Sequence, residues 1–324
     1  MPLEDILAAV GLLAVIAYAV LGGADFGGGV WDLCAQGPRG DQQRAAIAHA
    51  MGPVWEANHV WLTFIIVLTF TAFPPAFWAL CVALFVPFHL VLFDITLRGA
   101  AFVFRNYGKQ NRAADRWGAI FGMANVITPV LLGMSIGAVS AGCLRWLAPL
   151  SLTIGGLALA LCAYLAAVYL TNETVAELQE DFRKRALLAG TFVVGLTALL
   201  LLVRFFEAPH LWDGLVSYRA APVLVAGLVS ALLSGWALLT RRYQLARLAA
   251  IVQVALLLAG WGLAQYPYVI FSDFRLAGAA APKATLLFVL YTIPFAAAVL
   301  LPSLWLLFAV FTGSQKQNGR GNIR

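Results

Sequence analysis

Nine apolar runs, each about as long as a membrane-spanning helix, divide this chain of 324 residues. A helix needs about 20 apolar residues to cross the hydrocarbon core of a bilayer. The expected spans are residues 6–33, 53–73, 76–97, 118–140, 149–171, 186–206, 219–240, 247–267 and 286–311. The sequence therefore predicts an all-α integral membrane protein with about nine transmembrane helices, arranged as two four-helix bundles plus one peripheral helix.

The low content of charged residues excludes a water-soluble protein. Only 11% of the residues are charged, whereas soluble domains carry about 25%. The net charge of +6 comes from basic residues scattered over short connectors, so no basic domain is available to bind nucleic acid. We expect residues 1–312 to form a single membrane domain and residues 313–324 a disordered cytoplasmic tail. The longest polar connectors, 105–117 and 172–185, are expected to hold one short helix each.

The distribution of Lys and Arg predicts the orientation of the spans. With nine spans, 16 of the 21 basic residues fall on one side of the membrane and 5 on the other. Cytoplasmic loops of membrane proteins carry an excess of Lys and Arg. The N-terminus is therefore expected outside (in the periplasm) and the C-terminus in the cytoplasm.

The candidates for ionisable groups inside the membrane are Asp25, Glu56, His59, His89, Asp94 and Arg98. Such groups are costly at membrane depth and usually face a bundle interior or a water-filled path. The orientation places Asp25 in the cytoplasmic half of the first span, and Glu56 and His59 in the first two turns of the second. Asp94 and Arg98 come near the cytoplasmic end of the third. Five polar groups from three helices are therefore expected at similar depth.

Simpler roles compete with a functional one for several of these residues. Asp94 and Arg98 stand four residues apart, a spacing that allows an ion pair along one helix face, and Arg98 could also extend to the membrane interface. His89, next to a proline, is more readily explained by a hydrogen bond to a neighbouring carbonyl. Glu56 and His59 have the spacing of half a di-iron site, but no second Glu-x-x-His occurs, so we expect no metal.

Asp25 and Glu56 are harder to explain as structural residues. Neither has an obvious cationic partner on its own helix, and a low dielectric favours the protonated carboxyl, which can then exchange protons near neutral pH. Five glycines lie within residues 22–29 around Asp25. They allow another backbone or a large cofactor to approach closely.

Specific motifs surround these residues. GADFGGG closes the first span over residues 23–29, and GPVWEANHVWL opens the second over 52–62, followed by TAFPPA over 71–76. Arg98, a Thr-Val-x-Glu-Leu segment at 174–178 and a Tyr-Pro-Tyr segment at 266–268 add to the pattern. The sequence resembles subunit II of cytochrome bd-type quinol oxidases, cyanide-insensitive members included. The resemblance is strong over the first 110 residues and collinear to about residue 312.

This resemblance implies a heterodimer with a larger subunit I. That subunit would carry two haems b, a haem d and the site for membrane quinol, and the complex would reduce dioxygen to water in a bacterial inner membrane. The present chain would ligate no haem. Whether it holds a quinone or a lipid, and whether a small single-span subunit joins the complex, stays open.

The resemblance also implies roles for individual residues. Asp25, Glu56 and Arg98 would lie near the subunit boundary on a proton path from the cytoplasm, and depth adds Asp94 and His59 to this group. Residues expected to pack at the same boundary are Trp55, Asn58, Trp61, Gly23 and Gly27.

Two other functions compete with this one. A secondary transporter would use a first helix broken at residues 27–29 to bind a small solute or ion, but no second glycine-rich break appears in the later half to form an inverted repeat. A purely structural scaffold would leave Asp25 and Glu56 unexplained.

Overall fold

The computed structural model describes residues 2–51, 55–107, 112–142, 144–207, 209–271 and 273–321. Helices dominate this part of the chain. They are α1 (Leu3–Leu33), α2 (Gly40–Met51), α3 (Trp55–Ala72), α4 (Pro74–Ala83), α5 (Phe85–Tyr107), α6 (Arg112–Ala141), α7 (Pro149–Glu173), α8 (Ala176–Glu207), α9 (Pro209–Leu215), α10 (Ala221–Leu239), α11 (Tyr243–Gln265), α12 (Leu276–Ala279) and α13 (Lys283–Gly321). Strands β1 (Tyr268–Ile270) and β2 (Phe274–Arg275) pair as a small antiparallel ribbon after α11.

The described residues contain eight helices that are long and apolar enough to cross a membrane, namely α1, α5, α6, α7, α8, α10, α11 and α13. The chain is thus an all-α integral membrane protein. The remaining predicted span, 53–73, coincides with α3, whose apolar described part is the shorter segment His59–Ala72. The count of nine and the orientation across the membrane stay predictions.

The third predicted span is two helices. α4 ends at Ala83 and α5 begins at Phe85, with one turn residue, Leu84, between them. Pro87 explains the break, because proline has no N–H to donate and its ring clashes with the carbonyl four residues earlier, here that of Ala83. In the first turn of α5 the same proline is tolerated.

Several helix ends also differ from the predicted ones. α8 begins at Ala176, so the polar segment 172–185 holds the first turns of a long helix and not a separate short one. α13 continues as a helix to Gly321, well into the segment that was expected to be a disordered tail. In both places the helix continues through polar residues, which hydropathy alone assigns to a connector.

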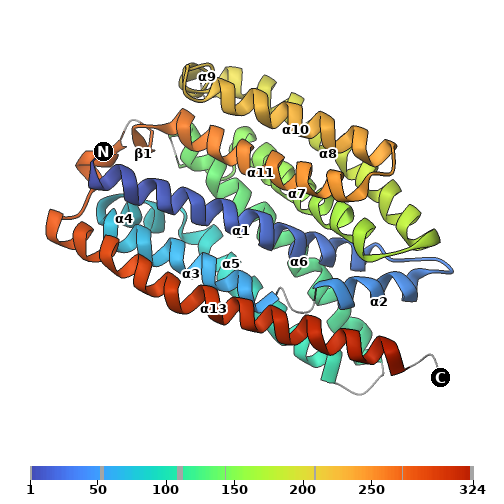
Figure 1. Cartoon of the computed structure of the whole chain (residues 1–324). Coiled ribbons are helices and arrows are strands. Elements are labelled where there is room, and N and C mark those ends of the chain that lie inside the picture. The colour runs from blue at the N-terminus through green and yellow to red at the C-terminus, as the bar shows by residue number, and fades with distance from the viewer. Residues whose placement is uncertain are drawn as a thin grey trace.

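The first helix lies at the centre of the helix packing (Figure 1). It packs against α3 and α6 and also against α7 and α11, and α13 lies along the outside of α3. α5 pairs with α6, while α7 pairs with α8 and α10 with α11. Because α6 also packs on α7, the first half of the chain meets the second along α1, α6 and α7.

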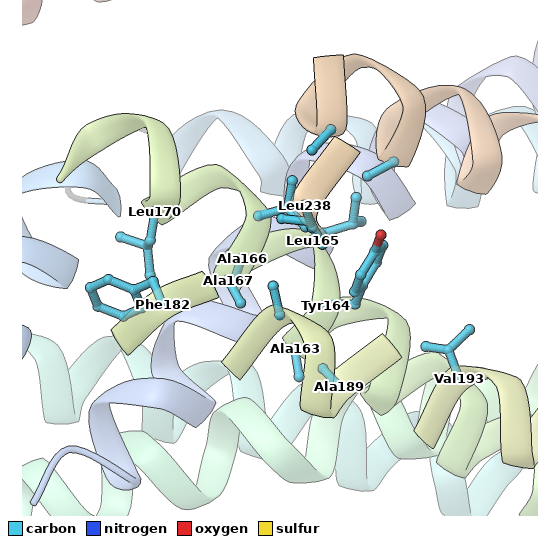
Figure 2. Packing of buried hydrophobic residues seen from close by; sticks show 14 of the residues in the cluster. Ala163, Tyr164, Leu165, Ala166, Ala167, Leu170, Phe182, Ala189, Val193 and Leu238 are labelled. Atoms are coloured by element: carbon cyan, nitrogen blue, oxygen red, sulfur yellow. The ribbon is translucent and has the colours of Figure 1, made fainter. Parts of the chain in front are cut away.

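The largest buried apolar cluster surrounds α7, and small side chains dominate it (Figure 2). Ala163, Ala166 and Ala167 allow α1 and α8 to approach the α7 backbone, and the larger Tyr164 and Phe182 fill the space beside them. Small residues at helix contacts are the usual means of close packing in membranes, where lipid is as apolar as the helix interior.

The glycine-rich end of α1 provides the closest of these approaches. A Cβ on Gly27 would lie 1.9 Å from the backbone oxygen of Cys162, and one on Gly23 would lie 3.1 Å from the Leu165 side chain. Both glycines therefore pack against α7 of the same chain. The helix runs through the glycines without interruption, so the broken first helix that a transporter would need is not present.

Replacing Gly27 with alanine should destabilise the protein, because the α7 backbone stands where the new methyl group must go. We expect a loss of about 1–3 kcal/mol, the usual range for overpacking, measured as a lower thermal unfolding midpoint in detergent. Gly195→Ala is the matched control, since a Cβ there meets nothing within 4 Å. It should leave the midpoint unchanged or raise it, because alanine favours helix. Equal midpoints for the two variants would contradict this account of α1 packing.

Candidate functional site

A buried ion pair between Asp25 and Arg98 is the centre of the site. Arg98 Nη2 donates to Asp25 Oδ2 at 2.7 Å, and the side chains are only 1% and 5% exposed for Arg98 and Asp25, respectively. The two residues are 73 positions apart and belong to α5 and α1. α6 packs against both helices, and the long arginine side chain spans the remaining distance to α1.

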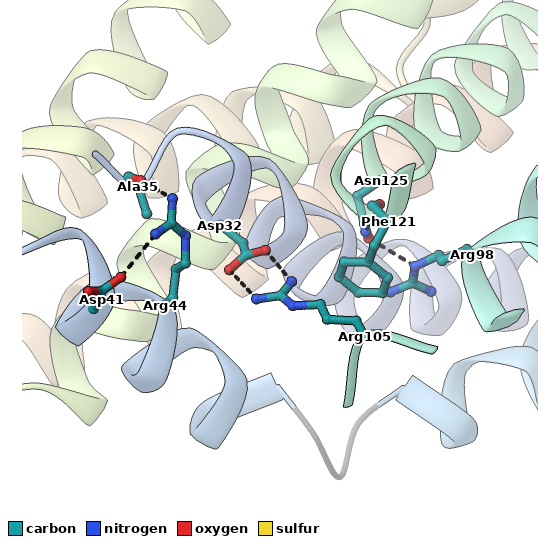
Figure 3. Close-up of polar contacts among 8 residues, drawn as sticks. All are labelled: Asp32, Ala35, Asp41, Arg44, Arg98, Arg105, Phe121 and Asn125. Carbon is teal, nitrogen blue, oxygen red and sulfur yellow. Dashed lines mark hydrogen bonds and ion pairs between the residues drawn. The ribbon is translucent and has the colours of Figure 1, made fainter. Parts of the chain in front are cut away.

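Further contacts of Arg98 come from α6, which covers the fourth predicted span, and from Phe26 on α1. Its Nε donates to Asn125 Oδ1 at 3.0 Å, and Asn125 Nδ2 donates in turn to the Phe121 carbonyl at 2.7 Å (Figure 3). The rings of Phe26 and Phe121 lie 4.8 Å and 5.4 Å from the guanidinium carbon, within the reach of cation–π attraction. Carboxylate, amide and two aromatic faces therefore fix one orientation of a cation that has no access to solvent.

Gly29 makes room for this arrangement. A Cβ at that position would lie 2.1 Å from Asn125 Cγ, so any other residue would displace the amide that orients Arg98. The glycines around Asp25 thus have two tasks. Gly27 brings α1 onto α7, and Gly29 admits the α6 side chain that completes the Arg98 contacts.

The spacing of Asp94 and Arg98 suggests an ion pair between them, but Asp94 binds Thr128 instead. The Asp94 carboxylate is buried and accepts a hydrogen bond from the Thr128 hydroxyl on α6. Arg98 makes its ion pair with Asp25 on another helix, and its complete burial contradicts an extension to the membrane interface. Inter-helix contacts prevail because α6 presents Asn125 and Thr128, three residues apart, on the face that meets α5.

The charge state of Asp25 follows from its partner. Asp25 has no cationic partner on its own helix, as expected, but Arg98 on α5 supplies one from another helix. A guanidinium at 2.7 Å stabilises the carboxylate, and the pair as a whole is neutral. Two opposite charges can then be buried together where one alone would cost several kcal/mol.

The other predicted residues divide into three groups. His59 lies close enough to Arg98 and Asp25 to be influenced by both charges, and the buried indole nitrogen of Trp61 finds no acceptor among the described residues. His89 Nδ1 lies 2.7 Å from the Phe85 carbonyl, which confirms its structural interpretation. The side chains of Trp55, Glu56 and Asn58, and the structure of residues 52–54, lie outside the described part of the chain.

Asn125, Thr128 and Tyr18 are the site residues that the sequence analysis missed. Asn125 and Thr128 are fully buried, and a polar pair three residues apart inside an apolar span was the available signal. Tyr18 stands seven residues before Asp25, so both lie on one face of α1. Its buried hydroxyl has no hydrogen-bond partner among the described residues, and it is near enough to Arg98 and Asp25 to interact with both charges.

A second polar network joins the segment between α1 and α2, and α2 itself, to α8. Arg39 binds Asp181 through two hydrogen bonds of 2.8 Å and 2.9 Å, and its Nη1 binds Glu177 at 2.6 Å. Gln43 links Asp181 to Arg185. The hydrogen bonds from Arg39 to Asp181 raise the pKa of Arg39 further above its ordinary value. Arg39 therefore stays charged at all physiological pH values.

Within the described residues, no three His, Cys, Asp or Glu side chains come together as they would around a metal ion. The histidines with described side chains, His49, His59 and His89, lie on α2, α3 and α5. The carboxylates and hydroxyls of the site are groups that can hold and exchange protons.

Comparison with known proteins gives one consistent result. Residues 3–311 match the family described as cytochrome bd terminal oxidase subunit II. A Bacillus subtilis (strain 168) protein named as a cytochrome bd menaquinol oxidase subunit II is 24% identical over 92% of each chain. Cytochrome bd-I ubiquinol oxidase subunit 2 of Escherichia coli (strain K12) is 26% identical over 56% of this chain and 51% of its own length. In fold, the chain resembles one in the structure of bd oxidase from Geobacillus thermodenitrificans, with a TM-score of 0.81, 24% identity and coverage of 96% and 99% of the two chains.

Breaking the buried pair from one side should cost more than removing both charges. Asp25→Asn and Arg98→Gln each leave one charge buried without its counter-charge, which costs about 3–5 kcal/mol. The double variant should be more stable than the sum of the two losses implies. The measurement is a double-mutant cycle on thermal unfolding in detergent. Strictly additive losses would contradict a direct ion pair.

Proposed function

Because the chain belongs to the cytochrome bd terminal oxidase subunit II family, we propose that it is the haem-free subunit of a bacterial enzyme that couples quinol oxidation to the reduction of dioxygen to water. The family is one of oxidoreductase complexes, and the eight apolar helices make this chain a multi-pass membrane subunit. The relatives are named for menaquinol and for ubiquinol, so the proposal specifies a quinol only as a class.

The proposed partner is a subunit I that carries two haems b, a haem d and the quinol site, in the bacterial inner membrane. When bound there, the haems supply electron transfer and oxygen reduction. The proposed tasks of the present chain are to assemble with subunit I and to deliver protons from the cytoplasm. A bound quinone or lipid on this chain and a small single-span third subunit are compatible with the proposal.

The buried pair of Asp25 and Arg98 is the observation that carries the proton-delivery role. A charge pair at this depth is costly to build, and intramembrane carboxylates are typical of proton relays. Its neighbours Asp94, Thr128 and Tyr18 carry further oxygen atoms that can exchange protons, and all are located on α1, α5 and α6. Glu56 and His59 on α3 are proposed members of the same path.

In this proposal Arg98 acts on the proton through the charge that it supplies. The guanidinium keeps its own proton, as arginine side chains do in proteins. Asp25 can then take a proton on a carboxylate oxygen and release it again, and the charge of the pair changes only between zero and +1. Asn125 and the two phenylalanine rings orient the guanidinium throughout. The pair thus accepts a transient proton without ever leaving a lone negative charge in the membrane.

Expression of the chain together with its neighbouring genes should yield a complex with haem d absorbance and quinol-dependent oxygen uptake. The visible spectrum and an oxygen electrode are the measurements. A purified complex that shows neither would contradict the assignment as an oxidase subunit. The same preparation is the reference for the variants below.

Glu56→Gln should slow oxygen uptake more than it lowers haem content, because the amide keeps the size of the side chain but cannot carry a proton. General acid–base groups typically contribute about 10²–10⁴-fold to a rate, and we expect a loss toward the lower end for one relay member. Glu177→Gln, a change at an exposed glutamate, is the control and should retain normal turnover. Parallel loss of haem and turnover in the Glu56 variant would indicate a role in assembly instead.

A further inference from the structure

A second ion pair repeats the geometry of the first one nearer the end of α1. Arg105 binds Asp32 through Nη1 to Oδ2 at 2.5 Å and Nη2 to Oδ1 at 3.0 Å (Figure 3). The two partners are again 73 residues apart and again belong to α5 and α1. Each member stands seven residues after its counterpart in the inner pair, so both pairs lie on one face of each helix, about 10.5 Å apart along the axis.

Phe121 separates the two pairs. Its ring centre lies 5.4 Å from the guanidinium carbon of Arg98 and 5.9 Å from that of Arg105. The ring is therefore within cation–π distance of both arginines and lies between their side chains in Figure 3. The backbone carbonyl of Phe121 also accepts the hydrogen bond of Asn125, which ties the ring to the inner pair.

Solvent reaches the two pairs to different extents. The Arg105 and Asp32 side chains are 25% and 8% exposed, whereas those of Arg98 and Asp25 are 1% and 5% exposed. The outer pair therefore touches water at the predicted cytoplasmic end of the bundle, and the inner pair does not. On α1 the same seven-residue spacing continues inward from Asp32 and Asp25 to Tyr18, whose buried hydroxyl has no partner in the part of the chain that is described.

From this geometry we propose that the Asp32–Arg105 pair is the cytoplasmic mouth of the proton path, where a proton first passes from bulk water to the protein. A cytoplasmic water gives its proton to a carboxylate oxygen of Asp32, which becomes a neutral acid. The acid then releases that proton inward to Asp25. Arg105 keeps its own proton, so the charge of the outer pair rises from zero to +1 and returns to zero. The inference rests on the proton-delivery function proposed above.

The distance between the carboxylates sets how the proton crosses. Direct transfer needs heavy atoms about 2.6–3.2 Å apart, or one bridging water. Because Asp25 and Asp32 are about 10.5 Å apart along the α1 axis, we expect the proton to cross by way of bridging waters beside the Phe121 ring. We expect this step to be slow. Because Asp32 supplies its proton, the loss of Asp32 should lower the overall rate of turnover.

Asp32→Asn in the complete, purified complex is the primary test. We expect quinol-dependent oxygen uptake to fall roughly tenfold or more, with unchanged haem content and a larger solvent hydrogen/deuterium isotope effect. Asp32→Glu should restore most of the rate. Propionic acid, a small weak acid that can carry protons past a missing surface carboxyl, should also restore turnover in the asparagine variant. A structural ion pair would show neither the isotope effect nor the rescue.

Asp181→Asn is the matched control. Asp181 also binds an arginine, Arg39, through two hydrogen bonds, but its network joins α2 and the segment before it to α8 and includes neither Arg98 nor Phe121. Its loss should lower the thermal unfolding midpoint and leave the isotope effect unchanged, with no response to propionic acid.

Comparison with Asp25→Asn separates the two proposals. If Asp25→Asn slows proton-dependent turnover and Asp32→Asn does not, the mouth of the path is elsewhere and the inference about Asp32 is wrong. If neither variant changes the rate or the isotope effect, the proton-delivery function itself fails. The inference is also wrong if Asp32→Asn loses turnover in parallel with haem and propionic acid does not restore it.

Discussion

The cost of placing charge inside a bilayer governs the structure around α1. Arg98 is completely buried, and its charge is balanced by Asp25 on a helix 73 residues away in sequence. Such a pair is stable only when its geometry and remaining hydrogen bonds are satisfied. Asn125 and the rings of Phe26 and Phe121 meet that requirement. α1, α5 and α6 must therefore keep one register, and this fixes where every other polar group of the site can lie.

Close helix approach makes this register attainable. Gly27 brings the α1 backbone to the α7 carbonyl at Cys162, and Gly29 leaves space for Asn125. The same few residues thus join the two halves of the chain and hold the ion pair. Membrane helices gain little from apolar burial against each other, so van der Waals contact at small residues and inter-helix hydrogen bonds carry much of the association.

The two ion pairs between α1 and α5 differ in their solvent exposure along the helix axes. The outer pair reaches water and the inner one does not, with an aromatic ring between them. Each of these two carboxylates has a fixed compensating charge from its arginine. The separate network of Arg39, Gln43 and Asp181 includes no residue of these two ion pairs and ties α2 and the segment before it to α8.

Hydropathy and motif determined the class of protein, because a span of about 20 apolar residues has few alternatives to a membrane helix. The depth of Asp25 and Arg98 could also be estimated along each helix separately. The ion-pair partners could not be predicted in this way. A spacing of four residues favoured Asp94 as the partner of Arg98, whereas the actual contact depends on how α5, α6 and α1 meet. The break at Leu84 was readable from Pro87, whereas the continuation of α8 and α13 through polar residues was not. The sequence alone thus determined a membrane bundle with charge at one depth. Only the tertiary structure decided which charges neutralise one another, since that choice depends on contacts between helices that are far apart in the chain.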